Sequence, residues 1–319
     1  MKKFIGYGLV FVFVVVVLLG GFYFLFPETV FKLAMDAQRR SADLVKKEVQ
    51  VDGQRIVYLE GGKGETILLL HGFGGNKDAW TAFAKYFKGY HLVIPDIPGF
   101  GESAQVPTQS YDIDSQVGRI ERFIGVLKLD TFHIAGNSMG GVFAATYGAA
   151  HPEKVLTITL MNTGGAPSQN KSEFVIQLEK GNNMFRISNI EDYNKLMDLI
   201  FVKRPAMPAA FRKIIAENVW IAHTEFNMKI WNDMLSVKSV ESVEFSKLTI
   251  GPTLSKVQAP VLIIWGDQDK VTDIGGVAVL EKSLTNHKTV IMKDTGHVPP
   301  IEKPEETAKA YLDFLKGKS

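Results

Sequence analysis

The fold is decided by the stretch FHIAGNSMGG, residues 132–141. Four mostly apolar residues lead into Gly-x-Ser-x-Gly, and small and apolar residues follow from 142 to 150. This pattern predicts a strand, a sharp turn and a helix, with Ser138 exposed on strained backbone at the turn. Gly136 and Gly140 flank the serine where we expect the strand and the helix to pack too closely for larger side chains. The N-terminus of the following helix favours negative charge that develops near the serine.

The composition fits one large globular domain, or one domain with an inserted part, because 46% of the 319 residues are hydrophobic and 22% are charged. The formal net charge is +2 and no basic run with interleaved aromatic residues is found, which argues against a nucleic-acid partner. The chain has no cysteine, so disulfides, thiolate catalysis and cysteine-based metal sites are excluded. No dinucleotide-binding, Walker-type or metal-binding motif is present, and we expect no cofactor.

The N-terminal region contains 23 residues without a formal charge, from 4 to 26. As a helix this segment would be about 34 Å long, enough to cross a hydrocarbon core of about 30 Å. It is longer than the apolar part of a cleaved signal peptide, and no good small-x-small cleavage site follows. The sequence therefore predicts a single-pass transmembrane anchor over residues 1–26. Cationic residues flank the segment on both sides, so the charge rule leaves the sidedness open.

The next segment, residues 27–46, is predicted to be a juxtamembrane helix and linker. Val30, Phe31 and Leu33 contribute to an apolar side, whereas Arg39 and Arg40 are cationic. Contact with a lipid surface and a plain connecting helix both fit this pattern.

From Lys47 onward the pattern changes to strands that alternate with helices. Residues 48–51 and 55–59 flank Asp52-Gly53, which indicates a β-hairpin. Further strands are expected at 66–70, 91–95, 132–135, 155–161, 261–265 and 289–292. Helices are expected at 79–87, 114–127, 141–150, 275–284 and 304–315. Buried strands alternating with helices predict an α/β fold, a mostly parallel sheet with helices on both faces and an antiparallel hairpin at its start.

Residues 164–258 break this alternation, because they are helical in pattern and rich in large apolar residues. They lie between two predicted strands of the core, which we assign to residues 47–163 and 259–319. We therefore predict a helical cap, or lid, over Ser138. Most of its apolar side chains would form the cap's own core, and a minority would face Ser138 and line a pocket.

In a parallel sheet the chemistry lies beyond the carboxyl ends of the strands. A glycine-rich loop, HGFGG at residues 71–75, follows the strand at 66–70. The backbone N–H groups of Phe73 and Met139 are candidates for an oxyanion hole. We expect His71 to orient this loop by hydrogen bonding rather than to act in catalysis. Asp96 is expected to cap backbone N–H groups, because Ser138 holds the position of the nucleophile.

Two later loops supply a candidate acid and a candidate base. Asp267 and Asp269 both follow the strand at 261–265, and we favour Asp269 because Gly-Asp is itself a turn signal. His297 follows the last strand and is the best candidate base. Ser138, Asp269 and His297 thus appear in the order of the α/β-hydrolase arrangement. His297 would deprotonate the Ser138 hydroxyl for attack on an acyl carbon, Asp269 would hold the imidazole tautomer, and water would then release the acid.

Four motifs carry a resemblance to a known family: HGFGGNKD at 71–78, GNSMGG at 136–141, IWGDQD at 264–269 and GHVP at 296–299. From about residue 69 to the C-terminus the chain resembles serine hydrolases of the α/β-hydrolase fold. It is similar in particular to membrane-associated bacterial lipases and to monoacylglycerol-lipase-like hydrolases with an N-terminal membrane segment. The resemblance implies carboxylester hydrolysis on a lipid ester, a mono- or triacylglycerol, by an enzyme held at the membrane.

Two other functions fit parts of the same sequence. The elbow sequence is also similar to that of soluble carbon–carbon bond hydrolases acting on ring-cleavage products, and the cap arginines Arg186, Arg204 and Arg212 are available to anchor a charged acid. A membrane-tethered binding protein with an idle hydrolase fold would be expected to lack a member of the triad, whereas all three are present here.

Overall fold

The computed structural model describes residue 21, residues 24–235 and residues 249–317. The predicted anchor over residues 1–26 lies almost entirely outside these residues. Among the described residues, no helix combines the length and apolar character needed to cross a membrane. The transmembrane anchor therefore stays a prediction.

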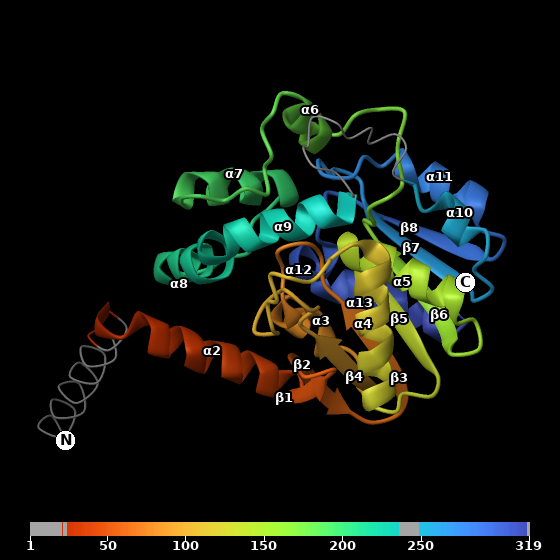
Figure 1. Cartoon of the computed structure of the whole chain (residues 1–319), viewed down its shortest axis with the longest axis horizontal. Helices are drawn as coiled ribbons and strands as arrows, with labels where there is room; N and C mark the ends of the chain where they lie inside the picture. Colours follow the sequence, from red (N-terminus) through yellow and green to blue (C-terminus); the bar gives the residue numbers. More distant parts are fainter. Residues whose placement is uncertain (1–20, 22–23, 236–248, 318–319) are drawn as a thin grey trace, which may run out of the picture.

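The predicted juxtamembrane helix is present as α2, Pro27–Ser41. Pro27 suits a helix start because its φ is already helical, while Glu28 in the first turn and the cations of the last turn complement the helix dipole. None of its residues is fully buried. In Figure 1 the helix projects from the rest of the molecule, and its C-terminal end reaches the first strands.

The core is one eight-stranded sheet in the order β1-β2-β4-β3-β5-β6-β7-β8. The strands are β1 Leu44–Val51, β2 Gln54–Gly62, β3 Glu65–Leu70, β4 Tyr90–Pro95, β5 Phe132–Asn137, β6 Val155–Met161, β7 Val261–Gly266 and β8 His287–Met292. β1 and β2 form the predicted hairpin, and β2 also pairs antiparallel with β4. All the other pairings are parallel. The hairpin turn needs positive φ at Asp52 (+50°) and Gly53 (+73°), which explains the Asp-Gly signal.

Helices cover both faces of this sheet, as predicted (Figure 1). They are η1 Lys77–Trp80, α3 Thr81–Ala84, α4 Ile113–Val126, α5 Met139–Ala150, α10 Gly251–Leu254, α11 Gly276–Ser283, α12 Pro299–Glu302 and α13 Pro304–Leu315. Alternate residues of β3 divide between two hydrophobic clusters: Leu68 and Leu70 join that of α4 and α5, and Ile67 and Leu69 join that of α3 and α13. Continuous apolar strands are thus explained by burial on both faces.

The predicted helix at 79–87 is shorter than expected. The chain forms one 3₁₀ turn and the four-residue α3, after which the N–H groups of Tyr86 and Phe87 bond three residues back, to Phe83 and Ala84. Such tight bonds end a helix, and Gly89 follows with a φ of +92°.

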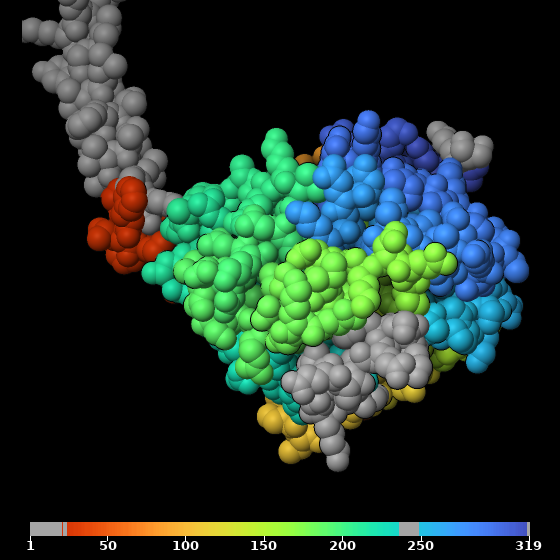
Figure 2. Space-filling view, turned by 90° about the horizontal axis from the view of Figure 1, so that it is seen from above, coloured from red at the N-terminus to blue at the C-terminus, as the bar shows by residue number. Residues whose placement is uncertain are grey.

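Besides α10, six short helices in the described part of the chain lie between β6 and β7, within the predicted cap segment. They are α6 Glu173–Glu179, α7 Ile190–Ile200, α8 Ala209–Ile215, the π-helical η2 Ala216–Trp220, η3 Ile221–His223 and α9 Thr224–Leu235. Ser172 and Asn189 cap the first two through side-chain oxygens. In Figure 1 these helices lie together beyond the sheet, and Figure 2 shows their green surface meeting the blue surface of the C-terminal part.

Candidate active site

Ser138 stands at the junction between β5 and α5, on a backbone with φ +53° and ψ −118°. Positive φ is rare for a residue with a side chain and marks the strained turn that the sequence predicts. Steric crowding explains why glycines flank Ser138. A Cβ at Gly136 would lie 2.0 Å from the Gly140 carbonyl oxygen, and one at Gly140 would lie 2.2 Å from the Leu70 oxygen. The turn is further held by the Ser138 N–H, which donates to the Met161 carbonyl at 2.9 Å.

The structure brings the candidate acid and base together. His297 Nδ1 lies 2.9 Å from Asp269 Oδ2, and the two side chains are 5% and 0% exposed. A carboxylate only accepts hydrogen bonds, so the imidazole proton resides on Nδ1 and Nε2 is left as the acceptor. This is the tautomer that a base needs to take the proton from a serine hydroxyl.

Asp269 is held by further donors. Its Oδ1 accepts the N–H groups of Val271 at 2.7 Å and Thr272 at 3.1 Å. Its Oδ2 accepts Thr272 Oγ1–H and Asn162 Nδ2–H, each at 2.6 Å. Burial raises the pKa of this carboxyl, but His297 and the hydrogen bonds outweigh burial and hold the pKa below its ordinary value. Asp267 instead accepts the Thr295 N–H at 3.2 Å, which suits a turn former.

Two asparagines that the sequence reasoning missed connect the loops of the site. Asn137 donates from Nδ2 to the carbonyls of Met161 and His297, both at 3.0 Å, so it joins the serine turn to the histidine loop. Asn162, at φ +45°, contacts Asp269 and accepts the Gly266 N–H at 3.3 Å. Both stand at the carboxyl end of a strand, and the same positional rule that selected Asp269 could have selected them.

The glycine-rich loop is oriented by His71, as predicted. Its Nδ1–H donates to the Gly72 carbonyl at 2.8 Å, and its Nε2 accepts the Ile97 N–H at 3.0 Å. Burial lowers the pKa of His71 to about 4, so the ring is neutral at pH 7. Gly74 has a φ of +67°, and a Cβ there would lie 2.4 Å from the ring of Trp220 in η2. The cap segment thus packs directly on this loop.

The two candidate oxyanion donors come from adjacent segments, since a Cβ at Gly72, next to Phe73, would lie 3.3 Å from Cβ of Ser138, next to Met139. Met139 is the first residue of α5, where N–H groups have no partner within the helix. Phe73 is buried, and its ring contacts three others, with centroids 5.0 Å from Phe185 and 5.5 Å from both Phe100 and Trp231. Phe185 and Trp231 belong to the cap segment, so cap aromatics hold the side chain beside the candidate donor.

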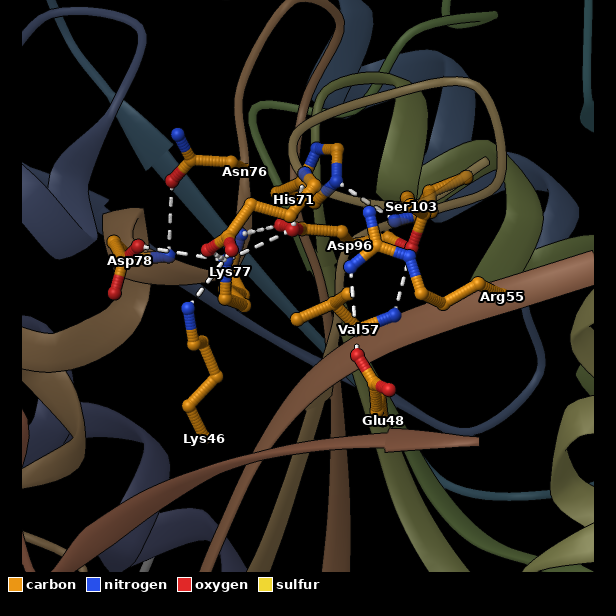
Figure 3. A network of polar contacts seen from close by, with 12 residues as sticks. Lys46, Glu48, Arg55, Val57, His71, Asn76, Lys77, Asp78, Asp96 and Ser103 are labelled. Carbon is orange, nitrogen blue, oxygen red and sulfur yellow. Dashed lines mark hydrogen bonds and ion pairs between the residues drawn. The ribbon is translucent and has the colours of Figure 1, made fainter. Parts of the chain in front are cut away.

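Asp96 caps backbone N–H groups, as expected, but it also takes part in a buried ion pair (Figure 3). Its Oδ1 accepts the Lys77 N–H at 2.7 Å, and its Oδ2 accepts the Glu102 N–H at 2.8 Å and the Lys77 ammonium at 2.9 Å. Burial lowers the pKa of Lys77, but Asp96 and its neighbouring carboxylates outweigh burial and raise it, so Lys77 is charged. The sequence reasoning did not identify Lys77.

Together these residues offer the parts of nucleophilic acyl chemistry: a serine on a strained turn, an imidazole with Nε2 available and a buried carboxylate behind it. Within the described parts of the chain, no group of three or more His, Asp or Glu side chains is placed to hold a metal ion.

Comparisons with known proteins agree with this geometry. The profile of the alpha/beta hydrolase fold family matches residues 65–304. Lipase 1 of Psychrobacter immobilis is 32% identical over 281 residues, covering 87% of this chain and 86% of that protein. Monoacylglycerol lipase ABHD6 of Homo sapiens is 29% identical over 306 residues, covering 92% and 88%. The crystal structure of a membrane phospholipase A, described as a bacterial virulence factor, superposes with a TM-score of 0.87 at 37% identity and covers 100% of this chain and 99% of that one. The chain therefore belongs to the α/β-hydrolase fold family, and its predicted resemblance to lipases and monoacylglycerol-lipase-like hydrolases is confirmed.

Proposed function

We propose that this carboxylester hydrolase cleaves lipid esters at the membrane through an acyl-enzyme on Ser138. The observation that carries the proposal is the buried His297–Asp269 pair, with its 2.9 Å contact, in a chain whose Ser138 occupies the strained turn. The lipase and monoacylglycerol lipase relatives support an ester of a lipid as the substrate.

The proposed reaction has two halves. His297 Nε2 takes the proton from Ser138 as the serine oxygen attacks the acyl carbon, and Asp269 stabilises the imidazolium that forms. The N–H groups of Phe73 and Met139 donate to the oxyanion, and one such donor contributes about 3 to 4 kcal/mol. His297 then protonates the alcohol oxygen as the ester bond breaks. In the second half His297 deprotonates water, which attacks the acyl group and releases the acid and the serine.

An apolar cap supports a lipid as the substrate. Phe174, Phe185 and Trp231 pack on one another with centroid distances of 4.6 to 5.8 Å, and two of them contact Phe73. These rings are buried, so the cap side of the glycine-rich loop is aromatic rather than charged, which suits an acyl chain. Mono- and triacylglycerols are both proposed as substrates.

Membrane attachment through the N-terminal segment is a separate part of the proposal. It is supported by the uncharged run at 4–26 and by three exposed apolar side chains at its described end, Phe24, Leu25 and Phe26, which are 79%, 73% and 52% exposed. Alkaline carbonate extraction of membranes from expressing cells tests it. Retention in the pellet is expected, and release into the supernatant would contradict an anchor.

The alternative, carbon–carbon bond hydrolysis of a charged ring-cleavage product, needs a cationic anchor in the cap. The three cap arginines are engaged elsewhere. Arg186 pairs with Glu225, Arg204 binds Asp198, and Arg212 donates to the Met207 carbonyl. This pairing favours the ester hydrolase over the alternative.

A hydrolysis panel on the purified full-length protein in detergent micelles tests the proposal, with Ser138→Ala as the matched control. The panel contains p-nitrophenyl esters of short to long chain, a monoacylglycerol, a triacylglycerol emulsion and a ring-cleavage dienoate. We expect Ser138-dependent release of fatty acid from acylglycerols, and mass spectrometry of a rapidly quenched reaction should find the acyl group on the Ser138 peptide. Turnover of the dienoate alone would replace this function by the alternative.

A further inference from the structure

Arg39 links helix α2 to the core of the molecule. Arg39 Nε and Nη2 each donate at 2.7 Å to a different oxygen of Asp78, and Nη1 donates to Asp36 on the same helix at 2.9 Å. The side chains of Arg39 and Asp78 are only 12% and 14% exposed. A two-pronged guanidinium–carboxylate contact with so little solvent is both directional and strong.

Asp78 lies in η1, three residues after the glycine-rich loop at 71–75 that supplies Phe73. Its N–H donates to Asn76 Oδ1 at 3.0 Å at the start of η1. The preceding residue, Lys77, is the buried cation whose N–H and ammonium both bind Asp96, and the ammonium also binds Glu102 at 2.7 Å (Figure 3). The start of η1, just after the loop, is therefore held by charges on two sides, Asp96 within the core and Arg39 on α2.

A second contact joins α2 to the cap segment. The ring of Phe31 meets that of Phe211 in α8 edge to face, with centroids 5.2 Å apart. In Figure 2 the red surface of the α2 region lies beside the teal surface of the cap. Trp220 ends η2, the segment that follows α8 directly, and it packs on Gly74 of the loop. Helix α2 thus contacts η1 through Asp78, and it contacts the cap segment that packs on the glycine-rich loop.

We infer that α2 positions the oxyanion hole, and that Arg39 acts through Asp78 as the positioning residue that keeps the Phe73 N–H aimed at the reacting ester. This inference rests on the proposed function. It means that the orientation of the segment next to the predicted membrane anchor sets the turnover of the enzyme. No contact of Arg39 with the substrate is required.

The charges around Lys77 explain why the loop would move without Arg39. The Lys77 ammonium lies 3.7 Å from Asp78 Oδ2, beyond its shorter contacts with Asp96 and Glu102. When Arg39 neutralises Asp78, Lys77 is held by Asp96. Without Arg39 the largely buried Asp78 carboxylate loses its bidentate cationic partner, and it attracts Lys77 away from Asp96. The Lys77 backbone, which shares Asp96 as its partner, would shift with it.

The test compares Arg39→Gln with Arg40→Gln in the full-length protein in detergent micelles. Arg40 is the next residue of the same helix and is exposed, so its variant controls for the lost charge. For Arg39→Gln we expect kcat on p-nitrophenyl butyrate to fall about tenfold with little change in KM, because loss of oxyanion alignment acts on the transition state. A trifluoromethyl ketone, which forms a tetrahedral adduct with the serine, should bind more weakly by the same factor. Asp78→Asn removes the carboxylate that would attract Lys77, so it should lose less activity than Arg39→Gln, and the double variant should recover activity relative to Arg39→Gln.

Hydrogen exchange at residues 72–79 provides a readout that needs no substrate. Faster exchange in Arg39→Gln than in Arg40→Gln is expected at a temperature well below the thermal midpoints of both variants, since the loss of a buried ion pair also lowers stability. The inference would be overturned if Arg39→Gln kept the kcat, the inhibitor affinity and the exchange rates of the wild type. It would also be overturned if a lower thermal midpoint alone explained the loss of activity. If the wild type hydrolyses no ester, the proposed function fails, whereas the exchange comparison still decides whether α2 holds the loop.

Discussion

Replacing Asp269 by asparagine should remove nearly all activity, whereas Asp267→Asn should retain it. The Asp269 carboxylate accepts five hydrogen bonds, of which two come from backbone N–H groups, those of Val271 and Thr272. Backbone donors cannot reverse their polarity, so the amide oxygen of the variant must face them. Its NH₂ group must then point toward the groups that contacted Oδ2, among them His297 Nδ1.

The magnitude follows from that orientation. An NH₂ group facing Nδ1 selects the imidazole tautomer with its proton on Nε2, which cannot accept the proton of Ser138. Loss of the correct tautomer costs about 10⁴-fold in kcat in serine proteases of known mechanism, equivalent to about 5.5 kcal/mol in the barrier. The NH₂ group also opposes the Asn162 amide donor, and one unsatisfied buried group costs about 1 to 3 kcal/mol of folding free energy. The variant should therefore lose activity far more than stability.

Steady-state kinetics with p-nitrophenyl butyrate and thermal unfolding measure the two effects. Asp267→Asn is the matched control, because Asp267 contacts the Thr295 N–H at 3.2 Å rather than the imidazole. Near wild-type kcat for Asp269→Asn, or a 10⁴-fold loss confined to Asp267→Asn, would refute the reasoning.

Three further predictions concern neighbouring residues. Asn162→Ala removes a donor to Asp269 and should lower kcat about tenfold, as expected for a hydrogen bond to a charged group; unchanged kinetics would contradict this. The pKa of folded His71 is about 4, below its unfolded value of about 6.5, so its contribution to stability is complete above pH 6.5 and declines toward pH 4, by about 3 kcal/mol. Urea unfolding at pH 7 and 4.5 should therefore show a smaller loss for His71→Gln than for the wild type, and equal losses would disprove the assignment. Gly140→Ala places a Cβ 2.2 Å from the Leu70 oxygen and should prevent accumulation of folded protein, whereas Gly125→Ala, with nothing within 4 Å, should stabilise α4 slightly; equal thermal midpoints would refute the steric argument.

The architecture could be predicted wherever the pattern was local. β6 at Val155–Met161 and α13 at Pro304–Leu315 have the predicted bounds, because an apolar run between polar residues and a proline at a helix start both act within a few residues. The steric role of the two glycines around Ser138 was readable for the same reason. The prediction at 79–87 was wrong in length, since helical periodicity does not report where the tight turns before Gly89 end the helix.

The sequence by itself determined the fold class, the order of strands and helices, and which loops gather at the carboxyl edge of the sheet. These follow from the pattern of apolar and polar residues along short segments of the chain. Only the tertiary structure decided that Asp269 rather than Asp267 contacts His297. It also decided that Asn162 donates to Asp269 across 107 positions of the chain, and that Arg39 binds Asp78 just after the glycine-rich loop. These contacts join segments far apart in the chain. Their geometry depends on how the packed sheet and helices place each loop, and no local pattern encodes that distance.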